Sequence, residues 1–151
     1  MATINQANLL YISEYVLTAA ILAFCTWRHG PLDIMRQIGR RTFLFRLIPV
    51  IIMTVAGISV MAGLHMVSMG AAAQLISIGA VQLIMTVFND TLLAASVFQR
   101  YRVYPRGASL AAVLVCLYAV ADLFMPWMTK YAVLLAAVAG GILLPEKRGN
   151  R

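Results

Sequence analysis

The chain has 151 residues, of which 62% are hydrophobic and 11% are charged, and its mean hydropathy is +0.87. A soluble domain carries about 45–50% apolar and about 25% charged residues, so this composition excludes an ordinary soluble fold. We expect an all-α, polytopic transmembrane helical bundle in which residues 1–151 form a single integral membrane domain.

Five apolar segments are candidate membrane spans, because the hydrocarbon core needs about 20 helical residues. The expected spans lie near residues 9–27, 47–69, 71–98, 108–125 and 130–144. Pro49 falls in the first turn of the second span, where a missing N–H costs little. The last segment is short, and if it re-enters the membrane instead of crossing it, the count becomes four.

The positive charges predict the orientation of these spans. The net charge is +7, yet the basic residues lie between apolar runs, which is a topology signal and not the pattern of a nucleic-acid-binding protein. All of them except Lys130 fall on one side of the five-span arrangement. The positive-inside rule then places the N-terminus outside and the C-terminus in the cytoplasm. Ten of the 12 basic residues are arginines, a bias that indicates a bacterial inner-membrane protein or a phage-encoded one.

The segment from Pro31 to Arg46 has helical spacing, with Leu32, Met35 and Ile38 on one stripe. It predicts an amphipathic helix on an anionic inner leaflet. Two roles remain open for this basic face: orienting and anchoring the chain, or docking a cytoplasmic protein. The candidate lipid- or partner-binding residues are Arg36, Arg40, Arg41, Arg100, Arg102 and Arg106.

Small residues four apart on the expected spans predict close helix packing. Ser59 and Gly63 form one such pair, and Ala136 with Gly140 and Ala137 with Gly141 form two more. Contacts within the chain and contacts between copies both fit this pattern. Five short spans enclose little volume, which favours self-association.

Ionisable residues inside spans are costly and are therefore functional candidates. Glu14, His65 and Asp122, together with Lys130, are each a few residues from the outer end of an expected span. They are either separate interfacial groups or one shared polar site for a proton, a cation or a small ligand.

Asp90 lies deeper, near the middle of the third span. Gln82, Asn89 and Ser96 repeat every seven residues and share one helix face, with Thr86 near it and Asp90 at its edge. A polar stripe on an apolar helix must meet protein or water. It acts either as interhelical hydrogen bonding or as the lining of an aqueous path.

The chain contains no HExxH, GxGxxG, P-loop or GxSxG motif, and its two cysteines, Cys25 and Cys116, form no CxxC pair. We expect no enzyme activity, no cofactor and no metal site. The leading hypothesis is an oligomeric membrane subunit or sensor that anchors a cytoplasmic partner. The alternative is an ion channel, pore or small transporter formed by an oligomer around the stripe of the third span.

Overall fold

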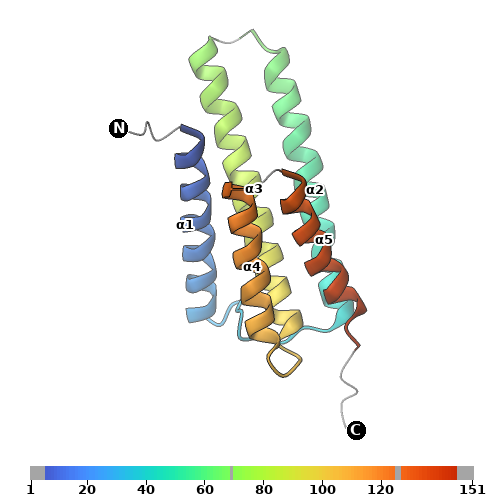
Figure 1. Ribbon diagram of the computed structural model, residues 1–151. Helices are drawn as coiled ribbons and strands as arrows, with labels where there is room; N and C mark the ends of the chain where they lie inside the picture. Colours follow the sequence, from blue (N-terminus) through green and yellow to red (C-terminus); the bar gives the residue numbers. More distant parts are fainter. Residues whose placement is uncertain (1–5, 69, 125–126, 146–151) are drawn as a thin grey trace, which may run out of the picture.

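The computed structural model describes residues 6–68, 70–124 and 127–145, and side chains within 12–68, 70–121 and 131–145. The described residues form helices and connecting turns, without strands (Figure 1). The elements are α1 (Gln6–Trp27), α2 (Arg40–Met66), α3 (Ala71–Tyr101), α4 (Gly107–Phe124) and α5 (Trp127–Leu143). The expected all-α fold is confirmed at this level.

The longest feature is the antiparallel hairpin of α2 and α3. At 1.5 Å per residue these helices measure about 40 Å and about 46 Å, whereas α4 and α5 measure about 27 Å and about 25 Å. All five helices meet at the end that carries the 28–39 loop and the α3–α4 turn, so the far end of the hairpin projects beyond α1, α4 and α5 (Figure 1).

The second helix begins earlier than the sequence predicts. It starts at Arg40 and not at Leu47, which puts Pro49 inside the helix. Gly39 precedes its first turn, and its carbonyl accepts the backbone N–H of Phe43 at 3.0 Å. The polar first turns are held by the packing of Phe43, which is completely buried.

The prediction of an amphipathic helix over residues 31–46 is wrong, because residues 28–39 form a series of turns and only Arg40–Arg46 are helical. Helix α1 ends in a Schellman motif: Gly30 N–H donates to the Cys25 carbonyl at 2.8 Å, and His29 N–H to Thr26 at 3.2 Å. His29 takes the left-handed conformation, with φ 51°. The carboxylate of Asp33 then accepts the Met35 N–H at 2.8 Å, which favours a turn over a helix.

A small core closes the shared end of the helices. Its buried members come from the loop, α2, α3, α4 and α5: Ile38, Phe43, Val97, Tyr101, Ala111 and Ala137. The small residues of α5 permit this approach. A methyl group added at Gly141 would lie 2.7 Å from the Phe43 ring, and one at Gly140 would lie 2.1 Å from the Tyr101 hydroxyl.

Some of the expected small-residue pairs pack inside the chain, and others are exposed. Ala137, Gly140 and Gly141 pack inside the chain, whereas Ala136 is exposed. Ser59 and Gly63 are also exposed, and nothing described lies within 4 Å of a methyl group built on Gly63. The close approach of α2 to α3 occurs instead at Gly57, which faces Met85.

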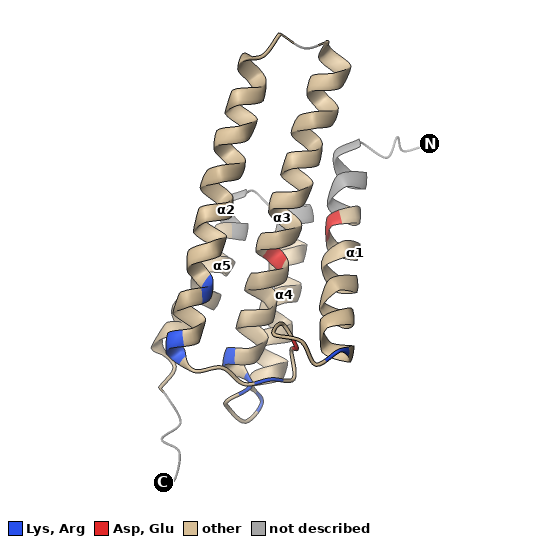
Figure 2. Ribbon diagram, turned by 180° about the vertical axis from the view of Figure 1, so that it is seen from behind, with Lys and Arg blue, Asp and Glu red and all other residues tan. Residues whose placement is uncertain are grey.

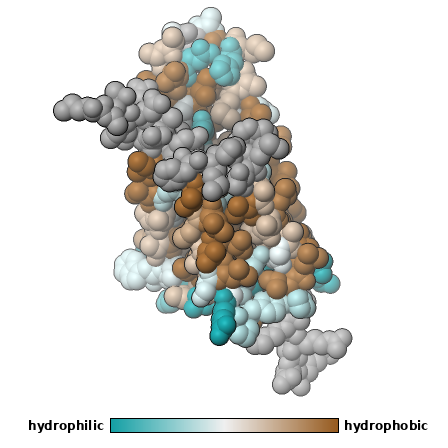
Figure 3. Space-filling model, viewed as in Figure 1, coloured by the Kyte–Doolittle hydropathy of each residue, from teal (hydrophilic) through white to brown (hydrophobic). Residues whose placement is uncertain are grey.

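Helices α2 and α3 are each long and apolar enough to cross a membrane. The other helices contribute shorter apolar stretches, at 12–27, 107–121 and 131–143. Large apolar side chains on α2 and α3, such as Ile52 at 62% and Ile76 at 71%, are exposed, unlike those of a core helix in a soluble protein. Apolar side chains cover the middle of the face in Figure 3, and polar ones gather at the lower end and near the upper tip.

The α3–α4 turn generates a stability prediction. Gly107 follows Arg106, whose φ is 64°, and a methyl group at Gly107 would lie 1.7 Å from the Tyr101 carbonyl oxygen. This obstacle is backbone, so the turn must move. We expect Gly107→Ala to destabilise the protein by about 1–3 kcal/mol, which lowers Tm by roughly 2–12 °C.

Thermal unfolding in detergent measures the change. Gly79→Ala is the matched control, because the same methyl group there, inside α3, meets open space and improves helix propensity. It should leave Tm unchanged or raise it. A Gly107→Ala protein that melts at or above the wild-type temperature would contradict the account of this turn.

Candidate functional site

Asn89 and Asp90 are neighbours in α3 but serve different interfaces, since consecutive helical residues point about 100° apart. The Asn89 side-chain amide donates to the Thr54 hydroxyl of α2 at 2.9 Å. The Tyr118 hydroxyl of α4 donates to Asp90 Oδ1 at 3.1 Å. The predicted polar region is thus two regions on two sides of α3.

The polar stripe on α3 contributes to the α2–α3 contact. In addition to the Asn89 bond, the Gln74 side chain donates to the Leu64 carbonyl of α2 at 3.1 Å. The Thr86 hydroxyl bonds back to the Gln82 carbonyl of its own helix at 2.9 Å. These contacts favour the interpretation of the stripe as interhelical hydrogen bonding.

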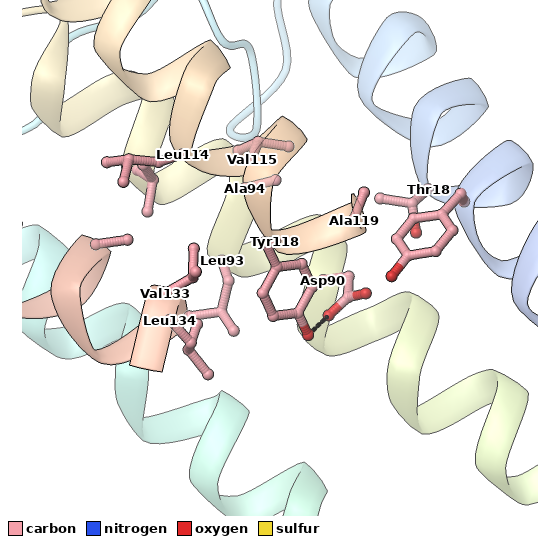
Figure 4. A pocket seen from close by; sticks show the side chains of 13 residues that line it. Thr18, Asp90, Leu93, Ala94, Leu114, Val115, Tyr118, Ala119, Val133 and Leu134 are labelled. Atoms are coloured by element: carbon pink, nitrogen blue, oxygen red, sulfur yellow. Dashed lines mark hydrogen bonds between the residues drawn. The ribbon is translucent and has the colours of Figure 1, made fainter. Parts of the chain in front are cut away.

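On the side of α3 that faces α1, α4 and α5 lies a cavity of about 80 Å³. Asp90, 9% exposed, forms part of its wall, together with the hydroxyl-bearing residues Thr18, Tyr15 and Tyr118. Figure 4 shows the Asp90 carboxylate between Tyr118 and Thr18. The rest of the wall is aliphatic: Leu93, Ala94, Val97, Leu114, Val115, Ala119, Val133, Leu134 and Ala137.

Glu14 is 1% exposed and lies one turn before Thr18 on the same inward face of α1. His65 does not join it. It is exposed and stands near the end of α2, on the part of the hairpin that projects beyond α1 (Figure 1). The structure therefore does not bring Glu14 and His65 into one shared site. The side chains of Asp122 and Lys130 lie outside the described part of the chain.

The second candidate region is the basic end of the bundle. Every Lys or Arg whose side chain the structure describes lies in this end (Figure 2). The Arg28 guanidinium packs over the rings of Phe24 and Trp27, at 5.8 and 5.9 Å from their centroids. Such a cluster of aromatic and basic groups is typical of a membrane–water boundary.

The 28–39 loop is fixed by Gln99, which is completely buried near the end of α3. Its side-chain amide donates to the Asp33 carbonyl at 2.6 Å and to the Pro31 carbonyl at 3.1 Å. Its Oε1 accepts from the Arg46 guanidinium of α2, and its backbone carbonyl accepts the Ile38 N–H at 3.3 Å. One side chain thus connects α3 to the loop and to α2.

Arg100 corrects a sequence-based expectation. It is 1% exposed, so it cannot belong to an inner-face binding surface. Its Nε donates to the Gly141 carbonyl at 2.9 Å, and its Nη2 donates to the carbonyl of Leu144. These carbonyls lie at and just beyond the C-terminus of α5, where an arginine also complements the helix dipole. Arg100 is a structural cap for α5.

The remaining predicted arginines differ in exposure. Arg102 is half-buried and donates to the Ile34 carbonyl at 3.3 Å, which adds a further support to the loop. Arg36, Arg40, Arg41 and Arg106 are exposed. The outward basic surface is therefore these four residues together with Arg28, all near the fixed loop.

Sequence reasoning missed Gln99 and Thr18 as site residues. Counting charges by side of the membrane says nothing about a neutral glutamine. A threonine in an apolar helix is common and carries no distinguishing pattern.

The described residues contain no group of three or more His, Cys, Asp and Glu side chains that could hold a metal ion. No protein-family model, curated protein or solved structure matches the chain.

Asp33 generates a prediction on pH. The Met35 N–H and the His29 ring, whose Nδ1 is 3.2 Å from Asp33 Oδ2, hold the pKa of this carboxyl below its usual 3.8. A carboxyl whose pKa is lower in the folded state than in the unfolded state stabilises the folded loop at pH values above its unfolded-state pKa. This stabilisation is lost as the pH falls through the folded-state pKa. We therefore expect the Met35 amide to stay protected down to about pH 4 and to lose protection below it.

Hydrogen exchange, corrected for the intrinsic pH dependence of the rate, measures this protection. Asp33→Asn is the control, because its amide oxygen still accepts the Met35 N–H but does not titrate. That variant should show no acid step. A wild-type step centred above pH 5, or an equal step in Asp33→Asn, would assign the acid response to another group.

Proposed function

We propose that the chain is a non-enzymatic, oligomeric subunit of a bacterial inner membrane, with five spans and its arginine end in the cytoplasm, where it docks a partner protein. The observation that carries this proposal is the set of exposed arginines on and beside the 28–39 loop, which buried side chains hold in place. In this proposal the exposed apolar side chains of the bundle contact lipid, and the arginine end binds the partner protein.

The helix dimensions support a membrane placement. With the arginine end at one interface, α1 is about 33 Å long and α4 and α5 are about 27 and 25 Å long, close to a hydrocarbon core of about 30 Å. The Arg28 cluster with Phe24 and Trp27 marks the interface at the end of α1. The positive-inside rule then assigns this end to the cytoplasm.

The fixed loop favours docking over simple anchoring. Orientation by positive charge works with flexible loops and does not need an ordered one. Here Gln99 and Arg102 hydrogen-bond the loop to α3. The backbone positions of Arg36, Arg40 and Arg41 are therefore fixed. Guanidinium groups in a fixed arrangement recognise carboxylates by paired hydrogen bonds. The partner surface that fits is acidic.

The projecting hairpin supports self-association. The small-residue pair Ser59 and Gly63 is exposed, as are the large side chains Ile58 and Met66 on the same helix. In a membrane, exposed small residues allow the backbones of two copies to approach closely. An ion channel around the α3 stripe has less support, because Asn89 and Gln74 already donate to α2.

The test replaces Arg36, Arg40 and Arg41 together with Gln in the full chain. Native mass spectrometry after mild-detergent purification from the source cell should show a stoichiometric cytoplasmic protein on the wild type. The triple variant should lose that protein but keep its own copy number. The wild-type complex should also dissociate as the salt concentration rises from 0.15 to 1 M, because the Debye screening length shortens to about 3 Å.

Two controls separate charge from misfolding. The triple Arg→Lys variant keeps the charge and should keep most of the partner. A reporter enzyme active only outside the cytoplasm should stay active after Met66 and silent after Arg106 in every variant. A wild type that carries no cytoplasmic protein, or a triple Gln variant that carries it undiminished, would overturn the docking role. Reporter activity after Arg106 would overturn the orientation.

A further inference from the structure

We propose that a groove at the arginine end binds the phosphate group of an anionic phospholipid. The groove measures about 170 Å³, is open along one side, and lies between the α3–α4 turn, the start of α4 and the end of α5. It shares no lining residue with the cavity beside Asp90. The proposal rests on the membrane placement of the proposed function, but not on the docking role of Arg36, Arg40 and Arg41.

The first observation is an exposed cation in the wall of the groove. Arg106 is exposed, and its side chain has no hydrogen-bond or ion-pair partner among the described residues. The acids whose side chains the structure describes, Glu14, Asp33 and Asp90, are each at most 9% exposed. Within the described part of the chain no surface acid neutralises Arg106, so its guanidinium is available to a phosphate, which it can bind through paired hydrogen bonds.

The second observation is the apolar remainder of the wall. The hydroxyls of Tyr101 and Tyr104 already donate to backbone carbonyls within residues 137–145. The two tyrosines therefore contribute mainly ring surface to the groove, next to the aliphatic side chains of Leu110 and Leu144. A cation beside aromatic and aliphatic surface is the combination expected where a charged headgroup meets acyl chains.

The third observation is an exposed apolar stripe that begins in the groove. Leu110, Val113, Leu117 and Val120 of α4 are spaced three or four residues apart, so they share one helix face. Each of them is 44–53% exposed, and Leu110 also lines the groove. An acyl chain attached to a phosphate beside Arg106 can follow this stripe into the hydrocarbon core. A soluble anion would leave the stripe unused.

The place of the groove in the fold also favours a lipid. It belongs to the end where the Arg28 guanidinium packs over Phe24 and Trp27, a cluster typical of the membrane–water boundary (Figure 2). Basic pockets between helices at the cytoplasmic boundary bind anionic headgroups. The volume exceeds the roughly 150 Å³ of a cavity that accepts benzene, so a phosphate ester has room in it.

The experiment places the full-length protein in phosphatidylcholine nanodiscs with increasing fractions of phosphatidylglycerol, and follows the amide NMR shifts of residues 104–110. In the wild type these shifts should move and saturate as the fraction of phosphatidylglycerol rises. Arg106→Gln should need about fivefold more of this lipid for half-saturation, which corresponds to about 1 kcal/mol for one basic residue at an anionic lipid surface. Arg106→Lys keeps the charge and should recover most of the loss.

Further variants separate the groove from the general charge of this end. Arg28→Gln is the matched control, because it removes one positive charge outside the groove, and it should leave half-saturation unchanged. Leu110→Ser keeps every charge but interrupts the apolar stripe, and should weaken the response about threefold. The triple Gln variant of Arg36, Arg40 and Arg41 should lose the partner protein and keep the lipid response, so the two proposals can fail separately.

Two other anions are tested as occupants of the groove. Glu146 follows Pro145 in the sequence, so a lipid response seen only in Glu146→Gln would assign the groove to the chain's own carboxylate and overturn the proposal. Inorganic phosphate added to phosphatidylcholine nanodiscs should leave the shifts of residues 104–110 in place. If it reproduces the lipid response, the groove binds free phosphate and not a lipid. An equal response in the wild type and Arg106→Gln, or no response in either, also overturns the proposal.

Discussion

Two buried polar side chains at the end of α3 hold this structure together. Gln99 is completely buried and Arg100 is 1% exposed, and between them they bond to the 28–39 loop, to α2 and to α5. Apolar helices in lipid gain little from hiding apolar surface against one another, so hydrogen bonds and close packing decide which contacts form. A buried donor that lost its acceptor would cost about 1–3 kcal/mol, which makes these bonds specific as well as stabilising.

Both candidate regions, the cavity beside Asp90 and the arginine end, depend on that end of α3. Through the carbonyls of Gly141 and Leu144, Arg100 keeps the end of α5 against α3, and α5 supplies Val133 and Leu134 to the cavity wall. Through Pro31 and Asp33, Gln99 orders the loop that carries Arg36 and leads into Arg40 and Arg41 of α2. The cavity beside Asp90 and the exposed arginines are therefore two regions of one framework.

The sequence predicted the helices well and the polar contacts poorly. Apolar length alone located all five helices within a few residues, except the start of α2, because Phe43 packing extends that helix through a polar turn. The stripe of Ala137 and Gly141 was visible because close packing needs small residues. Arg100 could not be predicted, since counting charges by side assigns every arginine to a surface. The separation of His65 from Glu14 could not be predicted, because each depth was counted from the end of its own helix and the helices differ in length.

Hydrogen exchange on Gln99→Met, compared with the wild type in the same nanodiscs, tests this account most directly. Methionine is close to glutamine in size but neither donates to Pro31 and Asp33 nor accepts from Arg46. The account predicts that amide protection in residues 30–38 falls at least tenfold, which corresponds to about 1.4 kcal/mol, while the α2–α3 seam near Asn89 and Thr54 keeps wild-type protection. Wild-type protection throughout the loop in this variant would show that Gln99 does not order the arginine end.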